Sequence, residues 1–181
     1  MKKFLTPMKI IAALGAAAAL VAMATFVLPA TPVAASDPYM DRSMLDAGKT
    51  TNADLEAMNQ HEIAWLLSQN KVLRESYQVE KDFQSLINVQ TKKHGNTTTL
   101  DIALGSYDTG LITAQKVHDG SAKIIGAQWG FDAQGHVYNR QYALITVTNA
   151  REGLRDTHYR LLLITHNLHR AYADWHNMII N

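Results

Sequence analysis

Apolar residues recur at spacings of three and four between residues 51 and 94, a stretch that contains no glycine or proline. This spacing places them on one face of an α-helix. Thr51 and Asp54 have the spacing of an N-terminal capping pair, and Gly95 suits the left-handed conformation that ends many helices. The pattern therefore predicts one long amphipathic helix. Its stripe comprises Leu55, Met58, Glu62, Leu66, Asn70, Leu73, Tyr77, Glu80, Phe83 and Ile87.

Polar residues interrupt this stripe at Glu62, Asn70 and Glu80. They argue against a long, dry coiled coil and allow a break near residues 68–71. An unbroken helix would extend roughly 60 Å at ~1.5 Å per residue, which is long for a domain of this size. We expect a core helix with a solvated far half, and a dedicated oligomerisation helix is the alternative.

The apolar spacing shifts towards two after Gly95. Leu100, Ile102 and Leu104 alternate with polar or small residues, which is typical of a half-buried strand. A later run is rich in Val, Ile, Thr and Tyr, which favour strands. The predicted elements are a strand over 98–104, a short helix over 111–118, a hairpin of strands 122–131 and 137–148 joined by a turn at 132–135, and a helix over 152–179.

These elements predict an α+β fold. The long N-terminal amphipathic helix and the C-terminal helix would cover one face of a small, mainly antiparallel sheet with a central hairpin. The C-terminal helix would pack on the sheet through one apolar face. That face carries Leu161, Ile164, Leu168, Ala171, Trp175 and Ile179.

The first residues of the chain have the order of a secretory signal peptide. Three lysines precede an apolar run at residues 10–28, and small residues then lead to Ser36, where we expect the mature protein to begin. The apolar run also approaches the ~20 residues that cross a bilayer, so an uncleaved anchor is the alternative. Either way, we expect an exported protein, periplasmic or extracellular, which contacts a membrane only through residues 10–28 if they are retained. Residues 36–50 would be a tether and residues 51–181 a single domain.

Charge and cysteine content exclude several kinds of partner and chemistry. The chain has 17 Lys and Arg against 16 Asp and Glu, and three of the lysines belong to the expected leader, so the remainder carries 14 cations and a formal charge of −2. This balance lacks the basic field that drives nucleic-acid binding. The chain has 0 cysteines, which excludes disulfides, thiol catalysis, iron–sulfur clusters and thiolate zinc sites.

Histidines in the C-terminal helix are the candidates for a metal site. His166 and His169 have the i,i+3 spacing that allows two imidazoles of one helix to bind the same ion. With a third ligand such as Asp174 or His61, the pair would suit copper, zinc or a haem iron. The alternative is a structural role as partly buried, hydrogen-bonded imidazoles.

Aromatic residues around the predicted hairpin are the candidates for ligand binding. Glycines flank Trp129 and Phe131, and Tyr138 and Tyr142 follow on the facing strand. Flanking glycines expose an aromatic ring to a close-approaching ligand. They also relieve twist in a hairpin, which is the alternative explanation.

The sequence contains no recognisable catalytic motif. The chain contains neither a GxSxG elbow nor a glycine-rich phosphate loop, so we assign no catalytic residue and favour a non-enzymatic role. The sequence therefore predicts an exported cell-envelope domain that mediates protein–protein interaction or self-assembly. The alternative is a sensor or carrier domain that binds a small ligand, a metal or haem.

Overall fold

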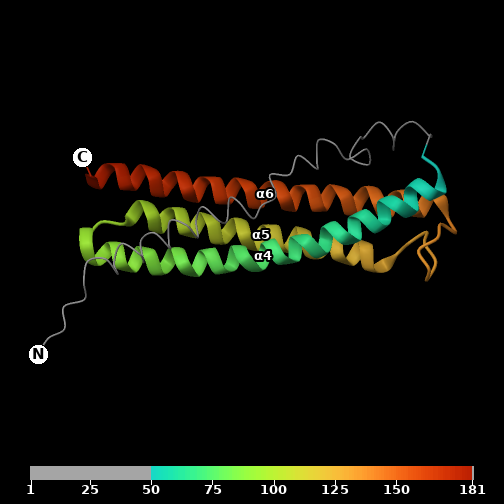
Figure 1. Cartoon of the computed structure of the whole chain (residues 1–181), viewed down its shortest axis with the longest axis horizontal. Coiled ribbons are helices and arrows are strands. Elements are labelled where there is room, and N and C mark those ends of the chain that lie inside the picture. Colours follow the sequence, from blue (N-terminus) through green and yellow to red (C-terminus); the bar gives the residue numbers. More distant parts are fainter. Residues whose placement is uncertain (1–49, 181) are drawn as a thin grey trace, which may run out of the picture.

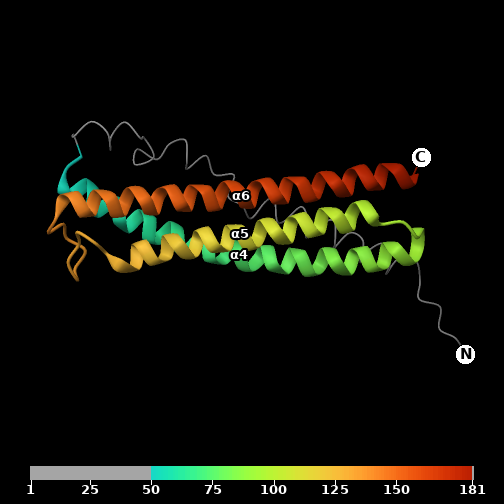
Figure 2. The same ribbon diagram turned by 180° about the vertical axis from the view of Figure 1, so that it is seen from behind.

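The computed structural model describes residues 50–180, which form an antiparallel bundle of three long helices (Figure 1). The helices are α4 (Asn52–His94), α5 (Thr98–Ala127) and α6 (Arg140–Ile180). Figure 2 shows the same bundle from behind, with α4 lying along the α5–α6 pair. The predicted α+β fold is wrong. Within residues 50–180 the sole β pairing is an isolated antiparallel bridge between Phe131 and Val137.

The first helix follows the sequence pattern closely. The Thr51 hydroxyl accepts the Asp54 N–H at 3.1 Å, and the Asp54 carboxylate accepts the Thr51 N–H at 2.7 Å, which forms the predicted capping box. Gly95 ends α4 with a φ of 79°. The helix runs continuously through residues 68–71, so the allowed break does not occur.

Helix α5 replaces the predicted strand 98–104, the short helix 111–118 and most of the strand 122–131. Its buried residues keep helical spacing throughout, whereas Ile102, which the alternating pattern placed inside a sheet, is exposed. Packing of this stripe outweighs the weak strand preference of the residues that start the helix. The buried positions are Leu100, Leu104, Tyr107, Leu111, Ala114, His118, Ser121 and Ile125.

Helix α6 merges the predicted strand 137–148 with the predicted C-terminal helix 152–179. The β-branched residues near its start also fit a helical stripe, in which Ala143, Val147 and Ala150 are buried. Farther along, Leu161, Leu168 and Trp175 are buried as the pattern indicated. They pack on the other helices instead of on a sheet.

Two glycines bring α5 and α6 close together. A β-carbon at Gly110 of α5 would overlap Cγ2 of Ile164, and one at Gly153 of α6 would overlap the Ser121 hydroxyl. Larger residues at these positions would push the helices apart, since protein interiors are close-packed. Helices α5 and α6 therefore make the closest helix–helix contact in the bundle.

A buried ion pair crosses the core between α4 and α6. Arg151 Nε donates to Glu62 Oε1 at 2.8 Å, and both side chains are fully or almost fully buried. Nearby, Gln69 Nε2 donates to the Leu154 carbonyl at 2.7 Å. The interruption of the sequence stripe at Glu62 is therefore an internal polar contact, and this residue does not face solvent.

The prediction about membrane contact can be compared with the structure only for residues 50–180. Across residues 50–180 we find no helical stretch apolar and long enough to cross a bilayer. The predicted leader 1–35 and almost all of the predicted tether 36–50 lie outside the described residues.

Candidate functional site

The candidate site lies at one end of the bundle, where residues 128–139 join α5 to α6 beside the start of α4 (the orange loop in Figure 1). We call this segment the tip loop. It begins at Gln128, which has a left-handed φ of 46°. The Gln128 Oε1 accepts a hydrogen bond from Asn59 Nδ2 of α4 at 2.8 Å. The first residue of the loop is therefore held by a partner 69 residues earlier in the chain.

Asp132 organises the centre of the tip loop. Its carboxylate accepts the backbone N–H groups of Gln134 at 2.9 Å and His136 at 2.8 Å. The Asp132 N–H in turn donates to the His136 carbonyl at 2.9 Å. The backbone hydrogen bond from His136 is the largest cause that lowers the pKa of Asp132, followed among the favourable causes by the bond from Gln134. Asp132 is thus an ionised acceptor that closes the turn.

Gly130 and Phe131 fasten the tip loop to the end of the core. Gly130 has a φ of 86°, and a β-carbon there would overlap the backbone nitrogen of Ala143. Its carbonyl accepts the N–H groups of Tyr138 at 3.0 Å and Asn139 at 3.2 Å. The Phe131 ring is buried, with 4% exposure, in the cluster that includes Leu55. Phe131 therefore anchors the loop through its buried ring.

Side chains from α4 and α6 fix the remaining backbone of the loop. The Thr146 hydroxyl donates to the Trp129 carbonyl at 2.8 Å, and the Glu56 carboxylate accepts the Val137 N–H at 2.8 Å. The Asn139 side chain accepts the Tyr142 N–H at 3.1 Å and caps the start of α6. These contacts leave the backbone little freedom.

This fixed backbone presents aromatic side chains to solvent. Trp129 is 61% exposed, Tyr138 69% and Tyr142 54%. A cavity of about 430 Å³ lies beside them and is lined by Trp129, Phe131 and Tyr138 together with Gln60 and Ile63 of α4. The structure thus brings three of the four predicted ligand-binding aromatics to one cavity, while Tyr142 lies outside its lining on the first turn of α6.

The predicted metal ligands lie on α6, away from the tip loop. His166 is exposed and His169 is half-buried. Of the third ligands suggested by the sequence, Asp174 forms an ion pair with Arg170 at 3.8 Å and His61 lies 3.5 Å from Glu62. Residues 50–180 contain no group of three or more His, Asp or Glu side chains arranged to hold a metal ion.

Other histidines contact aromatic rings. His158 meets the edge of Trp65 with ring centroids 6.3 Å apart, and burial lowers its pKa. His94 meets Trp175 at 5.8 Å, and the Trp175 Nε1 donates to the Asn96 carbonyl at 3.0 Å. These imidazoles belong to the packing between helices.

The sequence did not identify the residues of α4 and α6 that hold the tip loop. Asn59, Glu56 and Thr146 lie on helices as ordinary polar residues, and their partners are 17 to 81 residues away. No local pattern marks such pairs. Glu62, which pairs with Arg151 in the core, did carry a signal, because it is one of the polar residues that interrupt the apolar stripe of α4.

Comparisons with protein-family models, with curated proteins and with solved structures find no significant match. The function of the chain is therefore inferred from the chemistry of its own surface.

Proposed function

We propose that the domain is an exported, non-enzymatic component of the cell envelope that binds a protein partner through the tip loop. The observation that carries this proposal is the exposure of Trp129, Tyr138 and Tyr142 on a backbone held by side chains of two helices. Trp and Tyr are enriched at the energetic centres of protein interfaces. A pre-ordered loop also loses little conformational entropy on binding.

Export is supported by the N-terminal sequence. Lysines, an apolar run and small residues follow one another in the order that directs secretion. A cysteine-free chain needs no oxidative folding step, and its stability rests on helix packing.

The chemistry of the tip favours binding over catalysis. Asp132 lies in the cavity lining, and its backbone hydrogen bonds keep its pKa below the ordinary value. A catalytic acid or base works best with a pKa near the working pH. Asp132 is instead suited to holding the loop in shape.

Site-specific photocrosslinking in the native host tests the proposal. A photoreactive residue at Tyr138 should capture one discrete protein, and the Trp129→Ala exchange should abolish that product. The same probe at Tyr159, which is also exposed but lies on α6 well away from the tip, is the control. Equal capture from both positions, or capture that survives Trp129→Ala, would contradict the proposal.

Affinity measurements with the purified partner provide the quantitative test. Trp129→Ala and Tyr138→Ala should each weaken binding by about 30-fold, because truncation of a central aromatic residue costs about 2 kcal/mol. Tyr159→Ala should leave the affinity unchanged. Equal effects of all three exchanges would show that the tip is not the binding site.

Small-ligand binding is the second candidate, and the cavity beside Trp129 favours it. Its volume of about 430 Å³ lies within the range of roughly 300–1,000 Å³ that is typical of ligand pockets. Native mass spectrometry of protein purified from its host envelope distinguishes the two candidates. An added small-molecule mass that disappears with Trp129→Ala supports a carrier or sensor, whereas a complex with another polypeptide supports the first proposal. Added mass that disappears with His166→Ala/His169→Ala would instead indicate metal or haem binding.

A further inference from the structure

The charged residues of α5 all lie on one outward stripe of the helix. At about 100° per residue, they project within roughly 40° of the direction of Ile112. Ile112 is 43% exposed and lies at the centre of the stripe. We call this stripe the α5 face. It comprises Asp101, Gly105, Asp108, Ile112, Lys116, Asp119 and Lys123.

The α5 face is antisymmetric in charge about Ile112. Asp108 and Lys116 lie four residues on either side of Ile112, and Asp101 and Lys123 lie eleven residues on either side. A rotation of the helix by 180° about an axis through Ile112, perpendicular to the helix, therefore moves each of these two acids to the position of a lysine, and each lysine to the position of an acid. The fifth charge, Asp119, falls opposite Gly105 and meets no like charge.

We propose that this face binds a second copy of the chain, with the two α5 helices antiparallel and a two-fold axis passing beside Ile112. Each copy then contributes the same patch, as a closed dimer requires. Asp108 meets Lys116 of the other copy about 6 Å from the axis, and Asp101 meets Lys123 about 16 Å from it, at ~1.5 Å of helix rise per residue. Four intermolecular ion pairs result.

The four charges are available for such pairs. None of them forms an ion pair within residues 50–180. Asp101 accepts one neutral hydrogen bond, from the Thr97 hydroxyl at 3.2 Å, which leaves its charge without a cationic partner there. Asp108 instead lies close to Glu80 of α4: burial raises the pKa of Glu80, and the like charge of Asp108 raises it further. A lysine from a second copy would relieve this repulsion.

Asp119 contacts two side chains of its own helix. Its carboxylate accepts a hydrogen bond from the Gln115 amide at 2.8 Å and lies 3.5 Å from the His118 ring. It needs no partner from outside, which agrees with its position opposite a glycine.

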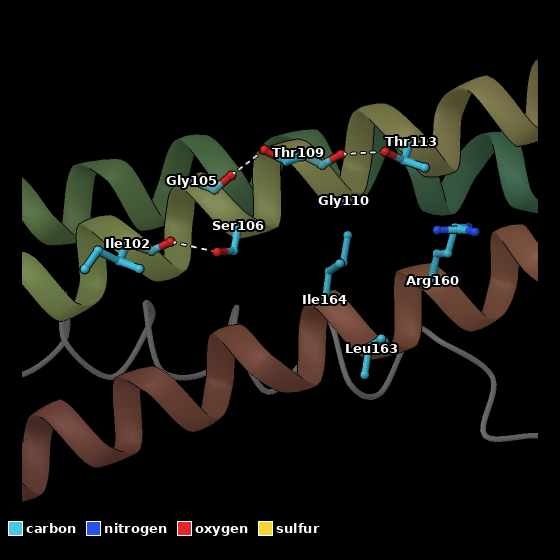
Figure 3. A pocket seen from close by; sticks show the side chains of 9 residues that line it. All are labelled: Ile102, Gly105, Ser106, Thr109, Gly110, Thr113, Arg160, Leu163 and Ile164. Carbon is cyan, nitrogen blue, oxygen red and sulfur yellow. Dashed lines mark hydrogen bonds between the residues drawn. The ribbon is translucent and has the colours of Figure 1, made fainter.

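The groove beside the α5 face allows close approach and supplies apolar contact. It lies between α5 and α6, has a volume of about 600 Å³, and is walled on α5 by small residues (Figure 3). The hydroxyls of Ser106 and Thr109 bond to carbonyls of their own helix, at 3.0 and 2.9 Å, so burying them leaves no donor unpaired. Ile102 and Leu163, which are 65% and 45% exposed, border this groove.

The contact is small and strongly charged, so the dimer should be weak and sensitive to salt. Exposed ion pairs contribute little each, and dissolved ions screen them. Sedimentation of the mature chain should show a monomer–dimer equilibrium at low salt whose dissociation constant rises as salt is added. A monomer at every concentration and salt level would overturn the proposal.

Charge exchange provides the decisive experiment. Asp101→Lys/Asp108→Lys gives an all-basic face, and Lys116→Asp/Lys123→Asp gives an all-acidic face. Each variant alone should dimerise at least about tenfold more weakly than the wild type, because like charges now meet. Mixing the two variants should restore dimerisation as a heterodimer. Failure of the mixture to associate, with both variants folded by circular dichroism, would contradict the antiparallel register.

The geometry at the axis has its own test, because the chain contains 0 cysteines. Ile112→Cys should cross-link to a second copy through a short bis-maleimide, since this residue meets its own counterpart at the axis. Leu67→Cys, at an exposed position on α4, is the matched control. Equal cross-linking from both positions would indicate random collision.

The α5 face shares no residue with the tip loop, so dimerisation is independent of partner binding at the tip. The exchanges at Trp129 and Tyr138 should leave dimerisation unchanged. The charge exchanges on α5 should leave capture of a partner at the tip unchanged. Either proposal can therefore fail without the other.

Discussion

At the scale of single residues, buried polar groups carry the sharpest energetic consequences. Glu62 and Arg151 are joined by one hydrogen bond of 2.8 Å, while the second carboxylate oxygen and both terminal guanidinium nitrogens have no hydrogen-bond partner among the described residues. Desolvation of such a pair roughly offsets its attraction, so the pair itself adds little stability. Breaking it, however, leaves an uncompensated buried charge.

Arg151→Leu should therefore lower the free energy of unfolding by about 3–5 kcal/mol, because it leaves Glu62 buried and unpaired. The double exchange Glu62→Leu/Arg151→Leu should recover most of this loss, since no buried charge then remains. Urea denaturation of the wild type, both single variants and the double variant measures the effect. A double variant as unstable as Arg151→Leu would show that the two side chains are not coupled in this way.

Asp132 makes the tip loop sensitive to acid. Its pKa is lowered from the ordinary 3.8, with the His136 N–H as the largest cause, so the folded loop binds a proton less readily than the unfolded chain does. The stabilisation is then fully present above about pH 4 and is lost as the pH falls through the folded pKa. The protection of the His136 amide against hydrogen exchange, relative to the intrinsic rate at the same pH, should fall below about pH 4. Asp132→Asn should exchange faster at neutral pH and lose this additional pH dependence.

At the scale of secondary structure, the starts of α5 and α6 were both wrongly predicted as strands, for the same reason. The starts of α5 and α6 are rich in threonine, valine and isoleucine, which suit strands as well as helices. Ile102 illustrates the ambiguity, because it is inside in the alternating pattern and exposed in the helix. Only α4 lacked such a competing pattern, and its bounds and capping box were predicted correctly.

The contact between α5 and α6 depends on a glycine where the helices are closest. Gly110→Ala should destabilise the bundle by about 1–3 kcal/mol, because the added methyl group would overlap Ile164. Gly120→Ala, where a β-carbon meets nothing within 4 Å, is the control and should be neutral or stabilising because alanine favours helices. Thermal unfolding compares the two variants. A second exchange, Ile164→Ala, should reduce the cost of Gly110→Ala, and simple additivity would argue against a direct contact.

At the scale of the whole molecule, the bundle separates two kinds of surface. One end holds the rigid tip loop with its exposed aromatics, and the side of α5 carries the charge pattern that reverses about Ile112. A variant that combines Trp129→Ala with Asp101→Lys/Asp108→Lys should lose partner capture and dimerisation together. Each loss should equal that of the separate variants, because the two sites share no contact.

The sequence by itself determined the features that depend on local chemistry. The helical stripe and the capping pair define α4, and the absence of cysteine excludes disulfides. Export, which the order of charge, apolar run and small residues indicates, stays a prediction. The glycines near Trp129, and the position of Tyr138 on the predicted facing strand, also marked these residues as candidates for binding.

Only the tertiary structure decided which elements form after Gly95 and which residues meet. Packing of α5 and α6 against each other and against α4 selected helices over strands, since a local pattern with two acceptable periods is resolved by the surface it can bury. Likewise, Glu62 pairs with Arg151, which lies 89 residues later in the chain, and Asn59 bonds to Gln128, which lies 69 residues later. Such contacts have no local signal, because each depends on the position of a distant helix. The Asn59–Gln128 contact, for example, holds the first residue of the tip loop to α4.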